Sequence, residues 1–483
     1  MHLAAIDSLP FSIRLNEPLI SMLNLLEFLS VVSPLVLVAC LAISFFMGIR
    51  LSESAISTLC KSCVLVGLGA SLAVLFIMLA TGERRLEFHL ADFVVLKVPG
   101  HHQHFHFDLR FVFDRLSVPM AIMSYVLCGT IGAFGAVYLH RESGYQRFFL
   151  FFSIFLAGMT LASLAFTIEA LFLGWELVGL SSALLVAYFH DRPSPVRNGQ
   201  RVWAVYRIAD ASFLIAAIFL HHLTGEGNFA ELLGSTAWPV GKASLTEWQA
   251  LTVGMLLLIA AAGKSALIPF SGWLPRAMEG PTPSSAVFYG ALSVHLGAFL
   301  LMRASPILQC STTLQVIIVL WGLATACYAV IVGRVQSDVK SALAFASLTQ
   351  VGIIVAEIGM GWWYVALVHL LGHACMRSLQ LLRAPNLLRD YRTIENAIGD
   401  HVVNTSPALV RQLPTGLQLR VFRFALERGY LDSLIQEWLV GPFDRMFRQF
   451  DRWERAWTDW LSGGDSRVSD HVSANVDSEE STR

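Results

Sequence analysis

Long apolar runs separated by short polar loops fill most of the sequence. Runs of about 20 apolar residues can cross the hydrocarbon core of a bilayer, so each is expected to form a membrane-spanning helix. We place such segments at about residues 24–48, 58–80, 116–139, 148–166, 168–190, 202–222, 249–275, 284–303, 313–333, 341–359 and 361–383. The pattern predicts an all-α fold, a polytopic transmembrane helical bundle of about 11–13 spans.

Composition supports this class, because 55% of the 483 residues are apolar and only 14% are charged, unlike a typical soluble domain. The formal net charge of −1 gives no reason to expect a nucleic-acid partner. The seven cysteines are scattered, and Cys60 and Cys63 have no second pair to complete a metal site. We therefore predict no metal site and no cofactor in this chain.

The positive charges in the short loops predict the orientation of the bundle, because cytoplasmic loops carry an excess of Lys and Arg. One set of loops holds Arg50, Lys61, Arg141, Arg147, Arg192, Arg197, Arg201, Arg334 and Lys340. The alternate loops hold mainly Lys242 and Arg303. This places the N-terminus outside and the C-terminus in the cytoplasm. The loop 81–115 is also basic, but longer loops cross with less regard to charge.

The outer loop contains the segment HHQHFHFDLRFVFD, whose alternating histidines and phenylalanines predict a short strand or hairpin. Four histidines, His101, His102, His104 and His106, are metal-ligand types. We favour a polar exposed strand over a metal site, because no cysteine or second spaced cluster completes the ligand set.

Three regions follow from the pattern: a transmembrane bundle at 1–383, a cytoplasmic amphipathic region at 384–462 and a disordered tail at 463–483. Aromatic residues recur at helical spacing over 420–461, with arginines alternating with acidic residues. Such helices either lie at the lipid headgroups or dock a cytoplasmic partner protein. The acidic residues weigh against a purely lipid-binding helix, and both interpretations stay open.

The segment LIAAAGKSALIPFSGWLPRAMEGPTPSS, residues 258–285, holds Lys264 in an apolar run. Pro269 and Pro275 follow, and they predict a break in this spanning helix. A lysine at membrane depth is expensive and usually functional. Irregular backbone at that depth must be buried in protein or line a hydrated cavity. Lys264 beside the break is therefore the centre of a candidate ion pathway.

Other ionisable residues also lie inside apolar runs. Glu176 stands between Gly174 and Gly179, and His295 lies in the span after the break. Arg207 and Asp210 are three residues apart, which predicts a structural ion pair, placed near the cytoplasmic end of its span. The spacing of His369, His373 and Arg377 puts them on one stripe of one helix. We interpret Glu357 as an interfacial charge.

Each of these groups would cost several kcal/mol if it faced lipid. Facing one another across hydrated protein, a carboxylate, a lysine and two histidines can exchange protons. The set therefore indicates a proton relay, although single histidines and ion pairs are often structural.

Six segments carry a resemblance to the antiporter-like membrane subunits of respiratory complex I and the Mrp antiporters. They are FDRLSVPM (113–120), LFLGWELVGLSS (171–182), RIADASFL (207–214), GKSALIPFSGWLPRAMEGPTPSSA (263–286), SDVKSALAFASLTQVG (337–352) and HLLGHACMR (369–377). The resemblance covers about 110–383. It implies an antiporter-like fold with discontinuous helices.

The resemblance also implies residue roles. Glu176 would be the glutamate that modulates the central lysine, Lys264, and His369 and His373 would be the family's paired histidines. Arg377 stands where complex I subunits usually carry a second lysine, and Tyr289 where they usually carry histidine. The later spans of those subunits have no counterpart here. Arginine stays protonated and is a poor proton carrier, so these departures suggest a narrower relative.

That narrower resemblance is to the DabB type, the membrane subunit of the DAB inorganic-carbon accumulation complex. It rests on FYGALSVHLGAFLLMR (288–303), HACMRSLQLLRAPNLLRDY (373–391) and ERGYLDSLIQEWLVGPF (427–443). The resemblance implies a bacterial inner-membrane location, with the N-terminus periplasmic. It implies a cytoplasmic DabA-like partner that holds zinc in a carbonic-anhydrase-like site. Proton flow through this chain would then drive one-way hydration of CO2 to bicarbonate.

We therefore expect a proton-conducting subunit, without chemistry of its own, in which His295 and Tyr289 join the Glu176, Lys264 and His369/His373 axis. Sodium is the alternative ion. A Na+/H+ antiporter or complex I-type pumping subunit is the alternative function. A structural membrane anchor for a soluble enzyme is the third, and it predicts that Lys264 is dispensable.

Overall fold

The computed structural model describes residues 17–97, 104–224, 227, 229, 234, 236–241, 243–336, 338–398 and 414–463, and the side chains of 92–108, 289 and 385–398 are outside the description. The chain divides into two compact units, Met1–Leu431 and Asp432–Arg483. The first unit holds the membrane-spanning bundle. Each unit is described by itself.

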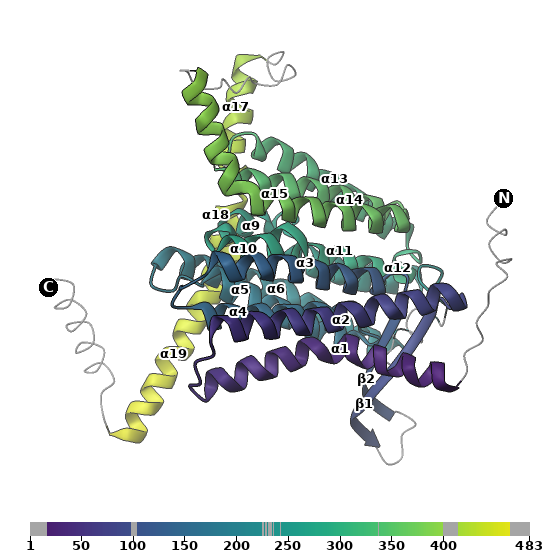
Figure 1. Cartoon of the computed structure of the whole chain (residues 1–483). Coiled ribbons are helices and arrows are strands. Elements are labelled where there is room, and N and C mark those ends of the chain that lie inside the picture. The colour runs from purple at the N-terminus through teal and green to yellow at the C-terminus, as the bar shows by residue number, and fades with distance from the viewer. Residues whose placement is uncertain are drawn as a thin grey trace. The chain divides into compact units, whose positions relative to one another are not determined.

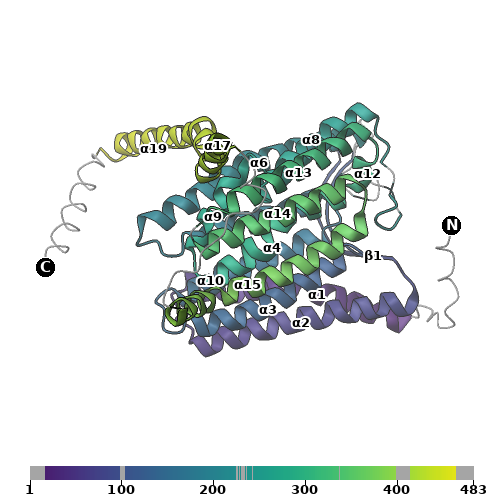
Figure 2. The same ribbon diagram turned by 90° about the horizontal axis from the view of Figure 1, so that it is seen from above.

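Ten helical stretches of the described chain are long and apolar enough to cross a membrane, so the predicted polytopic helical fold is confirmed. Their helices lie side by side in Figures 1 and 2. The long helices are α1 (Glu17–Phe46), α2 (Glu53–Thr81), α3 (Ser117–Tyr138), α4 (Tyr145–Leu164), α5 (Ile168–Val186), α6 (Pro193–Thr224), α8 (Glu247–Lys264), α11 (Ser293–Arg303), α13 (Thr312–Gly333), α14 (Val339–Gly359) and α15 (Trp363–Ile398).

Two helices extend well beyond the predicted spans. α6 begins at Pro193, nine residues before the predicted start at 202, because proline is well tolerated in the first turn of a helix. α15 continues to Ile398, so the predicted regional boundary at 383/384 lies inside a continuous helix. Hydropathy detects only the apolar part of a helix and misses such polar extensions.

The loop 81–115 folds into a hairpin, as the alternation of residues there indicates. Strand β1 (Arg85–Lys97) pairs antiparallel with β2 (His104–Asp114), with Arg85 opposite Asp114 and Lys97 opposite His104. Phe111 and Phe113 of β2 are buried against Val31 and Val74 of the first two helices, which anchors the hairpin to the bundle. The side chains of the four histidines, for which a polar exposed strand was favoured over a metal site, lie outside the described residues.

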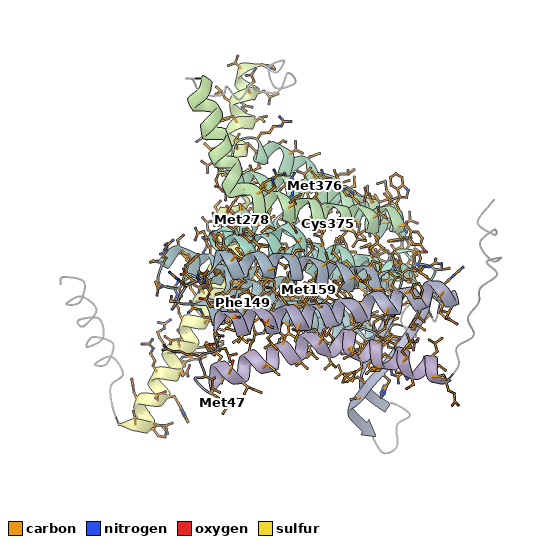
Figure 3. The ribbon with its side chains drawn as sticks, viewed as in Figure 1. Met47, Phe149, Met159, Met278, Cys375 and Met376 are labelled. Atoms are coloured by element: carbon orange, nitrogen blue, oxygen red, sulfur yellow. The ribbon has the colours of Figure 1, made fainter. Side chains whose placement is uncertain are left out.

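The core of the first unit surrounds α4, whose side chains, Phe149 and Met159 among them, are nearly all buried (Figure 3). α4 and α5 approach closely because Gly158 and Gly174 face each other. A Cβ atom on Gly158 would come within 2.9 Å of the Gly174 carbonyl oxygen. This close contact holds the start of the Glu176 helix in place.

The helix break predicted after Lys264 lies where the prolines indicate. α8 ends at Lys264, and residues 265–269 are not helical. Short helical turns follow: η1 (Phe270–Gly272), α9 (Trp273–Arg276), η2 (Ala277–Glu279), α10 (Thr282–Ser285) and the π-helical η3 (Ala286–Ala291). The chain then enters α11 on the other side of the break.

The predicted amphipathic region at 420–461 is helical. It comprises α17 (Thr415–Leu426), η4 (Arg428–Tyr430), α18 (Leu431–Ile435), the π-helical η5 (Gln436–Val440) and α19 (Gly441–Ser462). Aromatic rings contact one another along α19 in tilted pairs, with centroid separations of 4.7 Å between Phe443 and Phe447 and 5.4 Å between Trp457 and Trp460. No described residue of α19 is buried, so its aromatic face is uncovered within the second unit.

Candidate functional site

Lys264 is fully buried at the end of α8, where the helix breaks. Its Nζ donates a hydrogen bond of 3.0 Å to the backbone carbonyl of Trp175. The ammonium also lies over two aromatic rings, 4.8 Å from the centroid of Trp175 and 4.3 Å from that of Tyr206. These are cation–π contacts in a desolvated site, where such contacts are strongest. They hold the charge at the interface of α5, α6 and α8.

Arg207 of α6 bridges two carboxylates beside this lysine. Its Nη1 pairs with Glu176, and its Nη2 donates to Asp210 Oδ2 at 2.9 Å. Trp175 Nε1 donates to the other oxygen of Asp210 at 2.5 Å. The expected contact of Arg207 with Asp210 is present, but Arg207 is the 15th residue of α6, near its middle. The helix starts at Pro193, before the predicted span, and the position of Arg207 near the cytoplasmic end of the membrane-spanning part stays a prediction.

Two positive and two negative side chains therefore form one cluster: Lys264, Arg207, Glu176 and Asp210. Buried charges are tolerated when they balance and are hydrogen-bonded. Glu176 contacts Arg207 directly, so any influence of Glu176 on Lys264 acts through the shared field and not through a direct ion pair. Adding or removing one proton would leave the cluster unbalanced.

A second polar group lies on α11 and α15. His295 is fully buried, and its Nδ1 donates to the Ala291 carbonyl of η3 at 2.5 Å. Its Nε2 lies 2.9 Å from His373 Nδ1. Because Nδ1 of His295 is the donor, the neutral ring accepts at Nε2, and His373 Nδ1 carries the shared hydrogen. His373 Nε2 is then an acceptor, buried without a partner among the described residues.

His369, one turn before His373, contacts different partners. Its Nδ1 lies 3.0 and 3.1 Å from the two carboxylate oxygens of Glu357, and its Nε2 lies 3.0 Å from Gln350 Oε1. Glu357, interpreted from the sequence as an interfacial charge, therefore has a partner on the neighbouring helix. The short loop between α14 and α15 brings Glu357 against His369. The shortness of that loop was the feature of the sequence that could have predicted this contact.

The last two predicted pathway residues are placed differently. Arg377 is buried, and its Nη1 donates to Gln380 at 2.7 Å. Tyr289 lies in the π-helical turn η3, and its side chain is outside the described residues. π-Helical turns often mark functional sites, and this one supplies the carbonyl that orients His295.

Ser265 lies between the two groups. It follows Lys264 directly, and its Oγ faces Gly297 of α11, two residues after His295. This hydroxyl is buried and has no hydrogen-bond partner among the described residues. Buried hydroxyls are normally satisfied, often by ordered water. Sequence reasoning missed Ser265, since a serine in an apolar run carries no distinctive pattern.

Within the described part of the chain, no three His, Cys, Asp or Glu side chains are arranged to hold a metal ion. The described site is therefore one of charges, imidazoles and hydroxyls buried at a broken helix. This arrangement defines the class: a multi-pass, antiporter-like membrane subunit.

Comparison with known proteins agrees with the class. The family described as "NADH:quinone oxidoreductase/Mrp antiporter, TM" matches residues 165–410, and "NADH-Ubiquinone oxidoreductase (complex I), chain 5 N-terminus" matches 101–149. The first match covers more than half of the chain. The chain belongs to the NADH:quinone oxidoreductase/Mrp antiporter transmembrane family.

Individual relatives cover part of this chain. NADH-quinone oxidoreductase subunit L of Neisseria meningitidis is 33% identical over 285 residues, 58% of this chain and 42% of the relative. NADH-ubiquinone oxidoreductase chain 5 of Cryptococcus neoformans is 32% identical over 338 residues, which are 69% of this chain and 50% of the relative. The chain thus spans about half the length of the curated relatives it matches.

A solved structure shows the same fold. The Mrp complex from Dietzia sp. DQ12-45-1b aligns with a TM-score of 0.59 and 23% sequence identity, covering 85% of this chain and 43% of that chain. At this identity the likeness concerns the fold alone.

Proposed function

We propose that this chain is a proton-conducting, antiporter-like membrane subunit. The observation that carries the proposal is Lys264, fully buried at a helix break as one member of a charge-balanced cluster. A buried, hydrogen-bonded lysine can be charged or neutral according to its neighbours. Membership in the antiporter family supports the same conclusion.

The proposed path runs from His369 and His373 to His295, and then to Lys264 and the cluster around Arg207. A proton reaching His373 Nε2 allows His373 Nδ1 to release its hydrogen to His295 Nε2, 2.9 Å away. Water bonded to Ser265 would link His295 to Lys264. Protonation of Glu176 would remove its negative charge, so that Arg207 would pair with Asp210 alone. The weaker negative field would then no longer favour the charged form of Lys264.

Replacing Lys264 tests this path. We expect Lys264→Ala in proteoliposomes to lower the rate of proton uptake driven by an imposed potential by at least about a hundredfold, because the central carrier is lost. Lys61→Ala, an exposed lysine of α2, is the matched control. Conduction by Lys264→Ala at the control rate would contradict the proposal. An outward sodium gradient in parallel vesicles distinguishes a Na+/H+ antiporter from a proton conductor.

We further propose that proton flow through this chain energises CO2 hydration by a cytoplasmic, DabA-like zinc partner. The support is the likeness of segments 288–303, 373–391 and 427–443 to the DabB type, together with Arg377, a fixed charge in place of a proton-carrying lysine. Family membership supports the alternative more directly, a Na+/H+ antiporter or complex I-type pumping subunit. Complementation of a carbonic-anhydrase-deficient host separates the two.

A further inference from the structure

His369, where the proposed path begins, forms a hydrogen-bonded group with Glu357 and Gln350, two residues that the path does not yet use. The side chains of His369 and Glu357 are 27% and 12% exposed, so both are reachable from the surface of the unit. A carboxylate and an imidazole held against lipid would be expensive. Their partial exposure therefore points to contact with water.

The depths of these groups form a sequence from the membrane surface inward. At 1.5 Å per residue, Glu357 lies about 3 Å from the end of α14 at Gly359. By the same rise, His369 and His373 lie about 9 and 15 Å along α15 from Trp363. The α14–α15 loop lies on the side that the loop charges assign to the outside. The three side chains thus lead from the outer surface to the His373–His295 contact.

The geometry at His369 suits a proton that arrives and leaves. Both ring nitrogens face acceptor oxygens, those of the Glu357 carboxylate and the Gln350 amide. The doubly protonated ring can therefore donate a hydrogen bond from each nitrogen. Turning the Gln350 amide by 180° would offer an N–H to the neutral ring instead. The group can therefore hold His369 in either protonation state without leaving a ring nitrogen unpaired.

We propose that Glu357 is the outer proton-loading group of the pathway. It takes a proton from outside water onto its carboxylate, and the proton passes to His369 and then inward to His373. The charged and titratable groups facing this route are His369, His373 and Arg377 on α15, and His295 on α11. The inference rests on the proposed proton conduction and adds its entrance.

The test measures proton uptake into oriented proteoliposomes of the full chain. We expect Glu357→Gln to lower the rate from the outer side at least about tenfold, as removal of a proton-transfer group does. Glu357→His should restore conduction. Its half-maximal rate should move to higher outer pH, because imidazole titrates near 6.5 and a carboxyl near 4.3. A purely structural role would give no such shift.

Glu247→Gln is the matched control, since it removes an exposed carboxylate at the start of α8 on the same side. If Lys264→Ala abolishes conduction while Glu357→Gln conducts like Glu247→Gln, the role of Glu357 as the proton-loading group is overturned. The proposed path through Lys264 then stands. If Lys264→Ala conducts normally, the proposed function fails. Should Glu357→Gln misfold on size-exclusion chromatography, an unshifted pH dependence of folded Glu357→His overturns the inference.

Discussion

At the scale of single residues, two glycines on α5 have different neighbours although they lie five positions apart. A Cβ on Gly174 would come within 2.7 Å of the Gly158 carbonyl oxygen, a backbone atom of α4. A Cβ on Gly179 would come within 2.8 Å of Lys264 Nζ, the mobile end of a long side chain. The backbone of α4 cannot move away cheaply, whereas the lysine can.

Alanine at each position should therefore have a different effect. We expect Gly174→Ala to lower the free energy of unfolding by about 1–3 kcal/mol through overpacking. Gly179→Ala should fold normally but conduct more slowly, because Lys264 is displaced from the Trp175 carbonyl. Thermal unfolding in detergent and proton uptake measure the two effects. Gly69→Ala, with open space around its Cβ, is the control, and equal conduction by Gly179→Ala and Gly69→Ala would contradict the assignment.

At the scale of elements, one buried ion pair joins the hairpin to the bundle. Asp114 at the end of β2 pairs with Arg303 at the end of α11, with separations of 2.5 and 3.3 Å. Asp114 Oδ1 also accepts from the backbone N–H groups of Leu116 and Ser117 at the start of α3. Burial raises the pKa of Asp114, but Arg303 and these N–H groups outweigh it and hold the pKa below its ordinary value of 3.8.

This lowered pKa predicts a pH dependence of stability. The ionised Asp114 stabilises the fold above its unfolded pKa of about 3.9, and the stabilisation is lost as the pH falls through the lower folded pKa. We expect Asp114→Asn to destabilise the protein at pH 7 by about 3–5 kcal/mol, because Arg303 is left buried without its anion. Unfolding temperatures between pH 2.5 and 7 provide the measurement. The unfolding temperature of the variant should also fall less steeply at acid pH than that of the wild type. An equally steep fall would contradict the assignment of this pH dependence to Asp114.

Helix positions followed from the apolar runs, since lipid-spanning length is a local property. The contact of Arg207 with Glu176 did not, because the two residues lie on different helices and spacing constrains only residues on one helix. The stripe of His369 and His373 was likewise predicted from spacing. Their separate partners, Glu357 and His295, depend on how α11, α14 and α15 pack.

At the scale of the whole molecule, the two compact units suggest separate tasks. The first unit holds every buried charge of the candidate path. The second carries α19, where four arginines and four acidic residues balance over Gly441–Ser462. A neutral polar face gives little attraction to anionic lipid, so the uncovered aromatic face fits a protein partner better than a headgroup surface alone.

Co-expression with the DabA-like zinc protein in a carbonic-anhydrase-deficient host should separate these tasks. We expect the wild-type pair to support growth in ordinary air, and an uncoupler to abolish it. Lys264→Ala should retain the partner on co-purification but not support growth, because the ion path is interrupted. The double substitution Trp457→Glu and Trp460→Glu should conduct protons but lose the partner, because charges on the aromatic face oppose docking.

Glu454→Gln, an exposed change of charge on the same helix, is the control for α19. Growth supported by Lys264→Ala would show that hydration does not depend on the ion path, which favours the structural anchor. Failure of the wild-type pair to grow, with sodium-dependent proton movement in vesicles, favours the Na+/H+ antiporter instead. Retention of the partner by the double variant would assign the aromatic face to the membrane surface, since docking would then depend on other residues.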